Sequence, residues 1–166
     1  MKALESTHFL IRPAKSGEEA ILFDLILELA EYEGKDLAVL PINIESLKTF
    51  GFEDKPYFYT EFAEVDEKVV GYALYYYGFS ANQGFPILYL EDLYVKPEYR
   101  DLGIGTRFLK RLAQYALQRN CCRLEWHVFS WNREAINFYK KIGGILKENL
   151  IQVHLEKEHL QKITSY

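Results

Sequence analysis

The feature that most constrains this chain is an apolar segment at 87–95 that passes through a short glycine-containing turn into an amphipathic helix at about 104–119. A continuous apolar and aromatic run of that length is typical of a buried central strand. The first N–H groups of the following helix have no partners within the helix and lie at the positive end of its dipole, so they favour an anion. Gly103 and Gly105 carry no Cβ there, which lets a diphosphate approach the backbone.

The spacing of this turn separates it from two other phosphate-binding turns. A Walker-type loop requires Gly-Lys followed by Ser or Thr, and that combination is absent from the chain. A dinucleotide fingerprint requires a third glycine, but position 108 is Phe. Arg100 and Arg107 flank the glycines and add positive charge. Taken alone, the turn indicates either an anion site or an ordinary glycine-containing turn.

Length and composition describe one globular domain. The chain has 166 residues, of which 49% are hydrophobic and 27% charged, so we expect a single domain over 1–166. No apolar stretch approaches the ~20 residues that a membrane span requires, and the N-terminus lacks the apolar region of a signal peptide. A net charge of −4 argues against a nucleic-acid partner. We therefore expect a cytoplasmic protein that binds neither a membrane nor nucleic acid.

The cysteines and histidines predict neither a disulfide nor a metal site. Cys121 and Cys122 are adjacent, and neighbouring residues of a strand point to opposite faces, so a bond between them is not expected. None of the four histidines lies at a ligand interval from a cysteine or from another histidine. We expect no metal.

Hydrophobic periodicity and turn residues predict a sheet interleaved with helices. The order is β-α-α-β-β-β-α-β-α-β, which favours a mixed α/β or α+β fold over a doubly wound one. Asn132 is a good N-cap for the last long helix, and Gly143-Gly144 ends it. Strands are expected at 9–13, 57–65, 69–77, 87–95, 123–129 and 150–155, and helices at about 18–32, 44–50, 104–119 and 132–142, with a helical turn at 158–163.

A second motif lies downstream of the glycine turn, at 132–143. It reads Asn-x-x-Ala-x-x-Phe-Tyr-x-x-x-Gly, whereas the first reads Val-x-Pro-x-Tyr-Arg-x-x-Gly-Ile-Gly over 95–105. In this order, the two motifs resemble the signatures of the GNAT superfamily of N-acetyltransferases. The resemblance covers about 9–155 and is strongest to the spermidine/spermine (diamine) acetyltransferase group, through matches at 11–14, 28–33, 88–92 and 136–140. It implies a mostly antiparallel central sheet with a splayed strand pair and helices on both faces.

The resemblance also implies direct transfer of an acetyl group from acetyl-CoA to a primary amine. It assigns Tyr139 as the general acid that protonates the leaving thiolate, although by itself this residue also suits a core position. Glu91 is the expected general base, because burial in an apolar strand would raise its pKa; an ordinary surface acid is the alternative. The residues implied to hold acetyl-CoA are Leu93, Tyr94, Val95, Arg100, Asp101, Leu102, Gly103, Ile104, Gly105, Thr106, Asn132, Ala135 and Ile136.

The amine is expected on an acidic side of the same site. The residues implied there are Tyr32, Glu33, Glu91, Asp92 and His127, although His127 equally suits an ordinary sheet position. The chain departs from the polyamine enzymes, which carry acidic or aromatic residues at the positions aligned with Ala81, Gln83, Asn149 and Ile151. This difference favours a short diamine, a lysine-like amino acid or its thia analogue over a long polyamine.

Three hypotheses for the function remain open at this point. They are an acetyltransferase for a small cationic amine, a protein or peptide acetyltransferase for lysine or N-terminal amines, and a non-catalytic CoA-binding module. The resemblance also implies a homodimer formed through the last strand. The apolar residues Ile151, Val153 and Leu155 fit either such an interface or an ordinary core strand.

Overall fold

The computed structural model describes residues 8–165. The chain divides into two compact units, one ending at His127 and the other beginning at Val128. The single domain expected over 1–166 stays a prediction.

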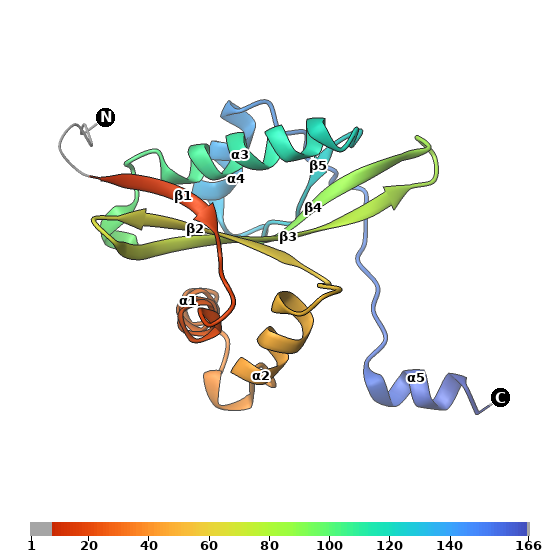
Figure 1. Ribbon diagram of the computed structural model, residues 1–166. Coiled ribbons are helices and arrows are strands. Elements are labelled where there is room, and N and C mark those ends of the chain that lie inside the picture. The colour runs from red at the N-terminus through yellow and green to blue at the C-terminus, as the bar shows by residue number, and fades with distance from the viewer. Residues whose placement is uncertain (1–7, 166) are drawn as a thin grey trace. The chain divides into compact units, whose positions relative to one another are not determined.

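The first unit contains a five-stranded sheet in the order β1-β2-β3-β4-β5 (Figure 1). β1, β2, β3 and β4 pair in turn with antiparallel neighbours, whereas β5 pairs with β4 in parallel. This confirms the mixed, mostly antiparallel sheet. The strands are β1 Phe9–Pro13, β2 Tyr59–Val65, β3 Lys68–Ser80, β4 Phe85–Val95 and β5 Leu124–Glu125.

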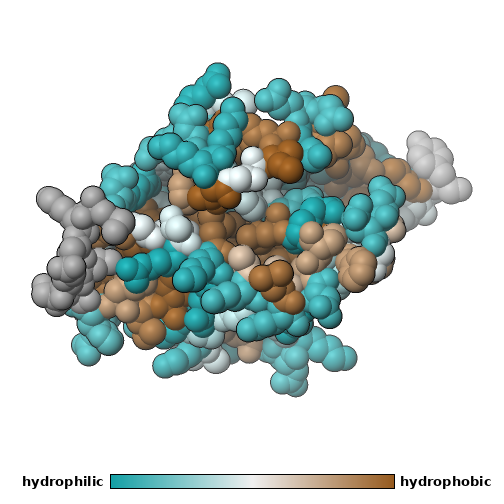
Figure 2. Space-filling view, turned by 90° about the horizontal axis from the view of Figure 1, so that it is seen from above, coloured by the Kyte–Doolittle hydropathy of each residue, from teal (hydrophilic) through white to brown (hydrophobic). Residues whose placement is uncertain are grey.

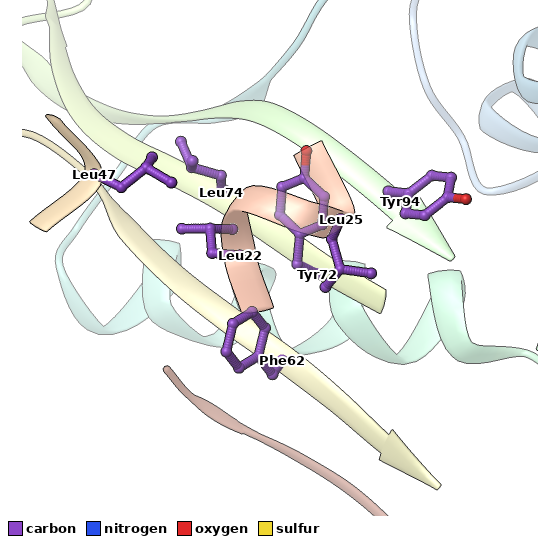
Figure 3. Close-up of a cluster of buried hydrophobic side chains, with 7 residues drawn as sticks. All are labelled: Leu22, Leu25, Leu47, Phe62, Tyr72, Leu74 and Tyr94. Atoms are coloured by element: carbon purple, nitrogen blue, oxygen red, sulfur yellow. The ribbon is translucent and has the colours of Figure 1, made fainter. Parts of the chain in front are cut away.

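Helices cover both faces of this sheet, as the resemblance implied. α1 (Glu19–Tyr32) and α2 (Ile44–Leu47) lie on one face, and α3 (Ile104–Gln118) lies on the other (Figure 1). A π-helical turn, Lys48–Phe52, extends α2. Under α1, seven apolar side chains form a buried cluster (Figure 3): Leu22, Leu25, Leu47, Phe62, Tyr72, Leu74 and Tyr94.

The second unit contains α4 (Arg133–Lys141) and α5 (Lys157–Ile163). The Asn132 side chain accepts a hydrogen bond from the Ala135 N–H at 3.1 Å, so the predicted N-cap is confirmed. Gly143 ends the helix with a φ of 91°, a conformation that favours glycine.

Two strand predictions near the C-terminus are wrong. The strand expected at 150–155 is not formed, and Ile151 and Val153 are 89% and 84% exposed. A strand requires the hydrogen bonds of a neighbouring strand, and within residues 8–165 none pairs with this segment. The strand expected at 123–129 contracts to the two residues of β5 for the same reason.

On the face that Figure 2 shows, hydrophilic side chains are interspersed with patches of apolar ones. Within residues 8–165, no helix has both the length and the apolar character needed to cross a membrane.

Candidate active site

The candidate active site is built around a β-bulge in β4. Leu90 pairs with Tyr75 and Asp92 pairs with Leu74, so Glu91 is an extra residue without a partner on β3. Tyr75 stacks on a tyrosine of α3, which places Leu90 on the α3 face. Leu74 belongs to the cluster under α1, which places Asp92 on the α1 face. In an uninterrupted strand Leu90 and Asp92 would share a face, so the bulge is what separates them.

Beyond the bulge, β4 has an edge with which no strand of residues 8–165 pairs, called its free edge below. β5 pairs with β4 only at Leu88 and Tyr89, which confirms the splayed strand pair. Lys96 donates its backbone N–H to β3 at 2.9 Å. Because the backbone groups of a strand alternate between its two edges, the N–H groups of Leu93 and Val95 point to the free edge. No strand within residues 8–165 takes these two N–H groups, and the implied contact of Leu93 and Val95 with acetyl-CoA stays a prediction.

The turn after β4 is shaped to receive an anion. Asp101 and Gly103 have φ values of 61° and 78°, which fold the chain back into α3. No side chain caps this helix within the described part of the chain, so the N–H groups of its first turn have no partner in the helix. The space beside Gly103 and Gly105 is open, because a Cβ placed on either would meet no atom within 4 Å. The Asp101 side chain is exposed.

These features fit the diphosphate of CoA. Leu102, Ile104 and Thr106 lie in the same turn and first helical turn as the two glycines, so the structure brings this part of the predicted cofactor set together. Free N–H groups at an uncapped helix N-terminus, with no side chain in front of them, suit a phosphate. The groups in this turn that fit a diphosphate are backbone N–H donors rather than charged side chains.

Arg100 has an additional role that the sequence did not reveal. Its Nε donates to the Val95 carbonyl at 3.0 Å. Its guanidinium lies 4.9 Å from the centre of the Tyr32 ring and 6.0 Å from that of Tyr94. These contacts tie the turn to β4 and to the end of α1. Arg100 therefore holds the shape of the turn, whatever else it binds.

The two acidic residues of the bulge differ in their surroundings, and here the sequence expectation needs correction. Glu91 is exposed, not buried, because the extra residue of a bulge lies outside the regular pleat. Asp92 is the partly buried acid. Its Oδ2 accepts a hydrogen bond at 2.9 Å from the hydroxyl of Tyr72, which is 0% exposed. Burial, together with the charges of Glu91 and Glu33, raises the Asp92 pKa to about 6.

The end of α1 supplies further charge to this side of the sheet. Glu33 follows α1 directly and pairs with Lys35 at 2.6 Å. The charges of both residues act on Asp92. Tyr32 is partly exposed beside them. The structure therefore places Glu33 near enough for its charge to act on Asp92, with Tyr32 next to Glu33 in the chain, and the binding of an amine by these residues stays a prediction.

His127 lies at the end of the first unit and contacts Tyr89 of β4. The Tyr89 hydroxyl bonds to its Nδ1, and the ring centres are 5.6 Å apart. Tyr89 in turn packs against Tyr76 with ring centres 5.0 Å apart. Burial and the charge of Glu91 raise the pKa of Tyr89 to about 12, so its hydroxyl stays protonated at neutral pH. His127 therefore contacts β4 through Tyr89, and its predicted role in binding the amine stays a prediction.

The remaining predicted residues belong to the second unit. Asn132 is engaged as the N-cap of α4 with Ala135, and Ile136 is half-buried in the same turn. Tyr139 is half-buried in the last turn of α4, and burial raises its pKa. Their roles stay predictions. Over residues 8–165, no three His, Cys, Asp or Glu side chains gather as a metal site would require.

The fold and this arrangement define the protein as an N-acetyltransferase. Residues 23–144 match the model of the acetyltransferase (GNAT) family, and the chain belongs to that family. GNAT enzymes use acetyl-CoA.

Two similar proteins carry the names of acetyltransferases. The thialysine N-epsilon-acetyltransferase of Bos taurus is 42% identical over 143 residues, which cover 81% of this chain and 83% of that protein. The spermidine/spermine N(1)-acetyltransferase-like protein 1 of Homo sapiens is 36% identical over 152 residues, which cover 87% of this chain and 22% of the human protein.

Solved structures share the fold. An integron cassette protein from the mobile metagenome of V. cholerae superposes with a TM-score of 0.79 at 28% identity, over 95% of this chain and 98% of that one. An aminoglycoside acetyltransferase from a soil metagenomic sample, in complex with sisomicin, superposes with a TM-score of 0.76 at 16% identity, over 93% and 99% of the two chains.

Proposed function

We propose that this enzyme transfers the acetyl group of acetyl-CoA directly to the primary amine of a small cationic substrate, of the lysine, thialysine or short diamine type. The observation that carries the proposal is the partly buried Asp92 on the α1 face, beside the free edge of β4 and close to the charge of Glu33. An ammonium group is attracted to such a site. The names of the relatives support the same substrate class.

The cofactor would be held along β4 and the following turn. Acetyl-CoA supplies an activated acetyl thioester when bound. The Leu93 and Val95 N–H groups would bind its extended arm and polarise the thioester carbonyl, where negative charge develops. The turn at 101–106 would bind its diphosphate through backbone N–H groups. These residues orient the donor, and Arg100 keeps the turn folded for it.

Two protons must move for an ammonium to become an amide. One leaves the ammonium before attack, and the acidic residues of the bulge are the groups able to accept it. The other leaves the nitrogen after attack, while the departing sulfur gains a proton. We assign to Tyr139 the donation of a proton to the departing sulfur. Its raised pKa keeps the phenol protonated and able to donate.

The experiment is an acetylation assay with acetyl-CoA and a panel of amines: lysine, thialysine, putrescine, spermidine and a lysine-containing peptide. We expect turnover of the small amines, with Tyr139→Phe reducing kcat by about 100-fold or more. Binding of acetyl-CoA is measured separately by calorimetry. Preference for the peptide would favour a protein acetyltransferase. Acetyl-CoA binding without turnover of any amine would favour a non-catalytic module, and a Y139F variant as fast as the wild type would refute the assigned acid.

Assembly and location are parts of the same proposal. A homodimer formed through the exposed segment at 150–155 would cover Ile151 and Val153 and give this segment the strand partner that it lacks within residues 8–165. Sedimentation at increasing concentration tests it, with Ile151→Lys as the variant that should shift the equilibrium to monomer. A cytoplasmic location stays a prediction.

A further inference from the structure

The last two turns of α1 are attached to the end of β4. Glu28 and Tyr32 are four residues apart, so they lie on one face of the helix. Glu28 accepts a hydrogen bond from the Tyr94 hydroxyl at 3.1 Å and pairs with the Lys96 ammonium at 2.5 Å. The Tyr94 hydroxyl points away from the buried cluster (Figure 3). This face of α1 is therefore fixed beside the place where the chain leaves β4 for the turn at 96–106, here called the cofactor turn.

Tyr32 is the residue of this face that meets the cofactor turn. The Arg100 guanidinium lies 4.9 Å from the centre of the Tyr32 ring. A guanidinium above an aromatic ring is attracted to the electron density of the ring face. Tyr32 is 43% exposed, so its ring is not a core side chain whose place is explained by burial alone. Because the ring belongs to a helix, its position is set by α1 and not by the turn.

Arg100 has few other contacts that could fix its orientation. Its Nε donates to the Val95 carbonyl at 3.0 Å, and the Tyr94 ring is a more distant contact at 6.0 Å. None of the ion pairs formed within residues 8–165 includes Arg100. A long side chain with one hydrogen bond keeps much of its rotamer freedom. The Tyr32 ring restricts that freedom to the rotamers in which the guanidinium lies over the ring.

We propose that Tyr32 is a positioning residue for acetyl-CoA, which acts through Arg100, and that it does not contact the amine. The inference rests on the proposed function and deepens it. Held by the ring, Arg100 keeps its bond to Val95 and so ties the middle of the cofactor turn back to β4. The N–H groups at the start of α3 are then already in place, and less ordering is needed when the diphosphate binds.

The test is the binding of CoA, without any amine, measured by calorimetry. Tyr32→Leu removes the ring but keeps an apolar helix-forming residue. A cation–π contact that is half exposed corresponds to about a three- to tenfold change in an equilibrium constant, so the Kd for CoA should rise by about that factor. Tyr32→Phe keeps the ring, and its Kd should stay within about twofold of the wild type. If Y32L fails to fold, Tyr32→Gln removes the same ring.

A double-mutant cycle shows whether Tyr32 acts through Arg100. Arg100→Met removes the guanidinium, so adding Y32L to R100M should raise the Kd no further. Tyr77 on β3 provides a matched control, because the Arg119 guanidinium lies 4.4 Å from the centre of its ring. Tyr77 pairs with Leu88, seven residues before β4 ends. Tyr77→Leu therefore removes the same kind of contact away from the cofactor turn and should leave the Kd for CoA unchanged.

Steady-state kinetics separate the cofactor side from the amine side. In Y32L the KM for acetyl-CoA should rise while the KM for the amine stays near that of the wild type. A higher KM for the amine in Y32F, with the Kd for CoA unchanged in both variants, would mean that the Tyr32 hydroxyl contacts the amine, and it would overturn the inference. An equal loss of CoA affinity from Y32L with and without Arg100 would also overturn it.

The inference and the proposed function fail in different ways. A wild type that binds CoA but acetylates no amine would refute the proposed function, whereas the role of Tyr32 would still be decided by the binding measurements. A wild type that binds no CoA would refute both. A wild type that acetylates amines while Y32L binds CoA as tightly as it does would refute the positioning role of Tyr32 alone.

Discussion

Replacing Asp92 with Asn should make the folded protein more stable at neutral pH and lower its catalytic activity. The pKa of Asp92 rises from 3.8 to about 6 on folding, chiefly because its charged form is partly removed from water. A difference of one in pKa corresponds to about 1.4 kcal/mol, so the difference of about 2 between the folded and unfolded pKa values corresponds to about 3 kcal/mol. Asn carries no charge, and its amide oxygen can still accept from Tyr72.

The sign of the pH dependence follows from the direction of the pKa change. Because the folded-state pKa is the higher one, the folded protein binds the proton more tightly than the unfolded chain does. The stabilisation from protonated Asp92 is complete below about pH 4 and is lost as the pH rises through 6. The advantage of D92N should therefore be about 3 kcal/mol at pH 7.5, shrink as the pH falls, and vanish near pH 4.

Thermal unfolding from pH 4 to pH 8 measures this difference. For a chain of this length, about 3 kcal/mol corresponds to a rise in Tm of roughly 6–12 °C at pH 7.5. Glu91→Gln is the control, because it removes a neighbouring but exposed carboxylate and should give no comparable pH-dependent gain. A D92N variant less stable than the wild type at pH 7.5 would mean that the charge of Asp92 is favourable in the folded state, which would refute the reasoning.

Three further predictions concern the scaffold. Arg111→Met removes the cation that pairs at 2.6 Å with the 2% exposed side chain of Glu61, and it should cost about 3–5 kcal/mol in urea unfolding at pH 7, with less loss in acid as this carboxylate protonates. Gly103→Ala should cost about 1 kcal/mol and weaken acetyl-CoA binding in calorimetry, whereas Gly84→Ala, also at positive φ, should lower stability only. Asn132→Ala removes the cap of α4 and should lower stability by about 1 kcal/mol, and no loss would show the cap to be dispensable.

Much of the first unit could be predicted from the sequence because its signals are local. The end of the apolar run at Val95, the glycines and the start of α3 at Ile104 follow from backbone preferences and the periodicity of apolar residues. The Asn132 cap is likewise a property of a few neighbouring residues. Such features need no knowledge of what packs against them.

The features that the sequence could not reveal depend on distant partners. Tyr72 is one of 13 tyrosines, and only the register of β3 against β4 shows that its hydroxyl meets Asp92. Arg100 looked like a phosphate ligand, but its contact with the Val95 carbonyl depends on how the turn folds. The segment at 150–155 has the composition of a strand, but within the described residues no strand pairs with it.

The bulge explains why the sequence could locate the site but could not show which of its two acids, Glu91 or Asp92, is the more buried. Before Glu91, the side chain of Leu90 points to the α3 face and Leu88 donates its N–H toward β5. With one extra residue, both alternations reverse: Asp92 moves to the α1 face beside Tyr72, and the N–H groups of Leu93 and Val95 turn to the free edge. A single unpaired residue therefore sets the amine side and the cofactor side together. Because regular alternation assigns Glu91 and Asp92 to fixed opposite faces, no reading of periodicity alone could show that the exposed acid is the first and the anchored acid the second.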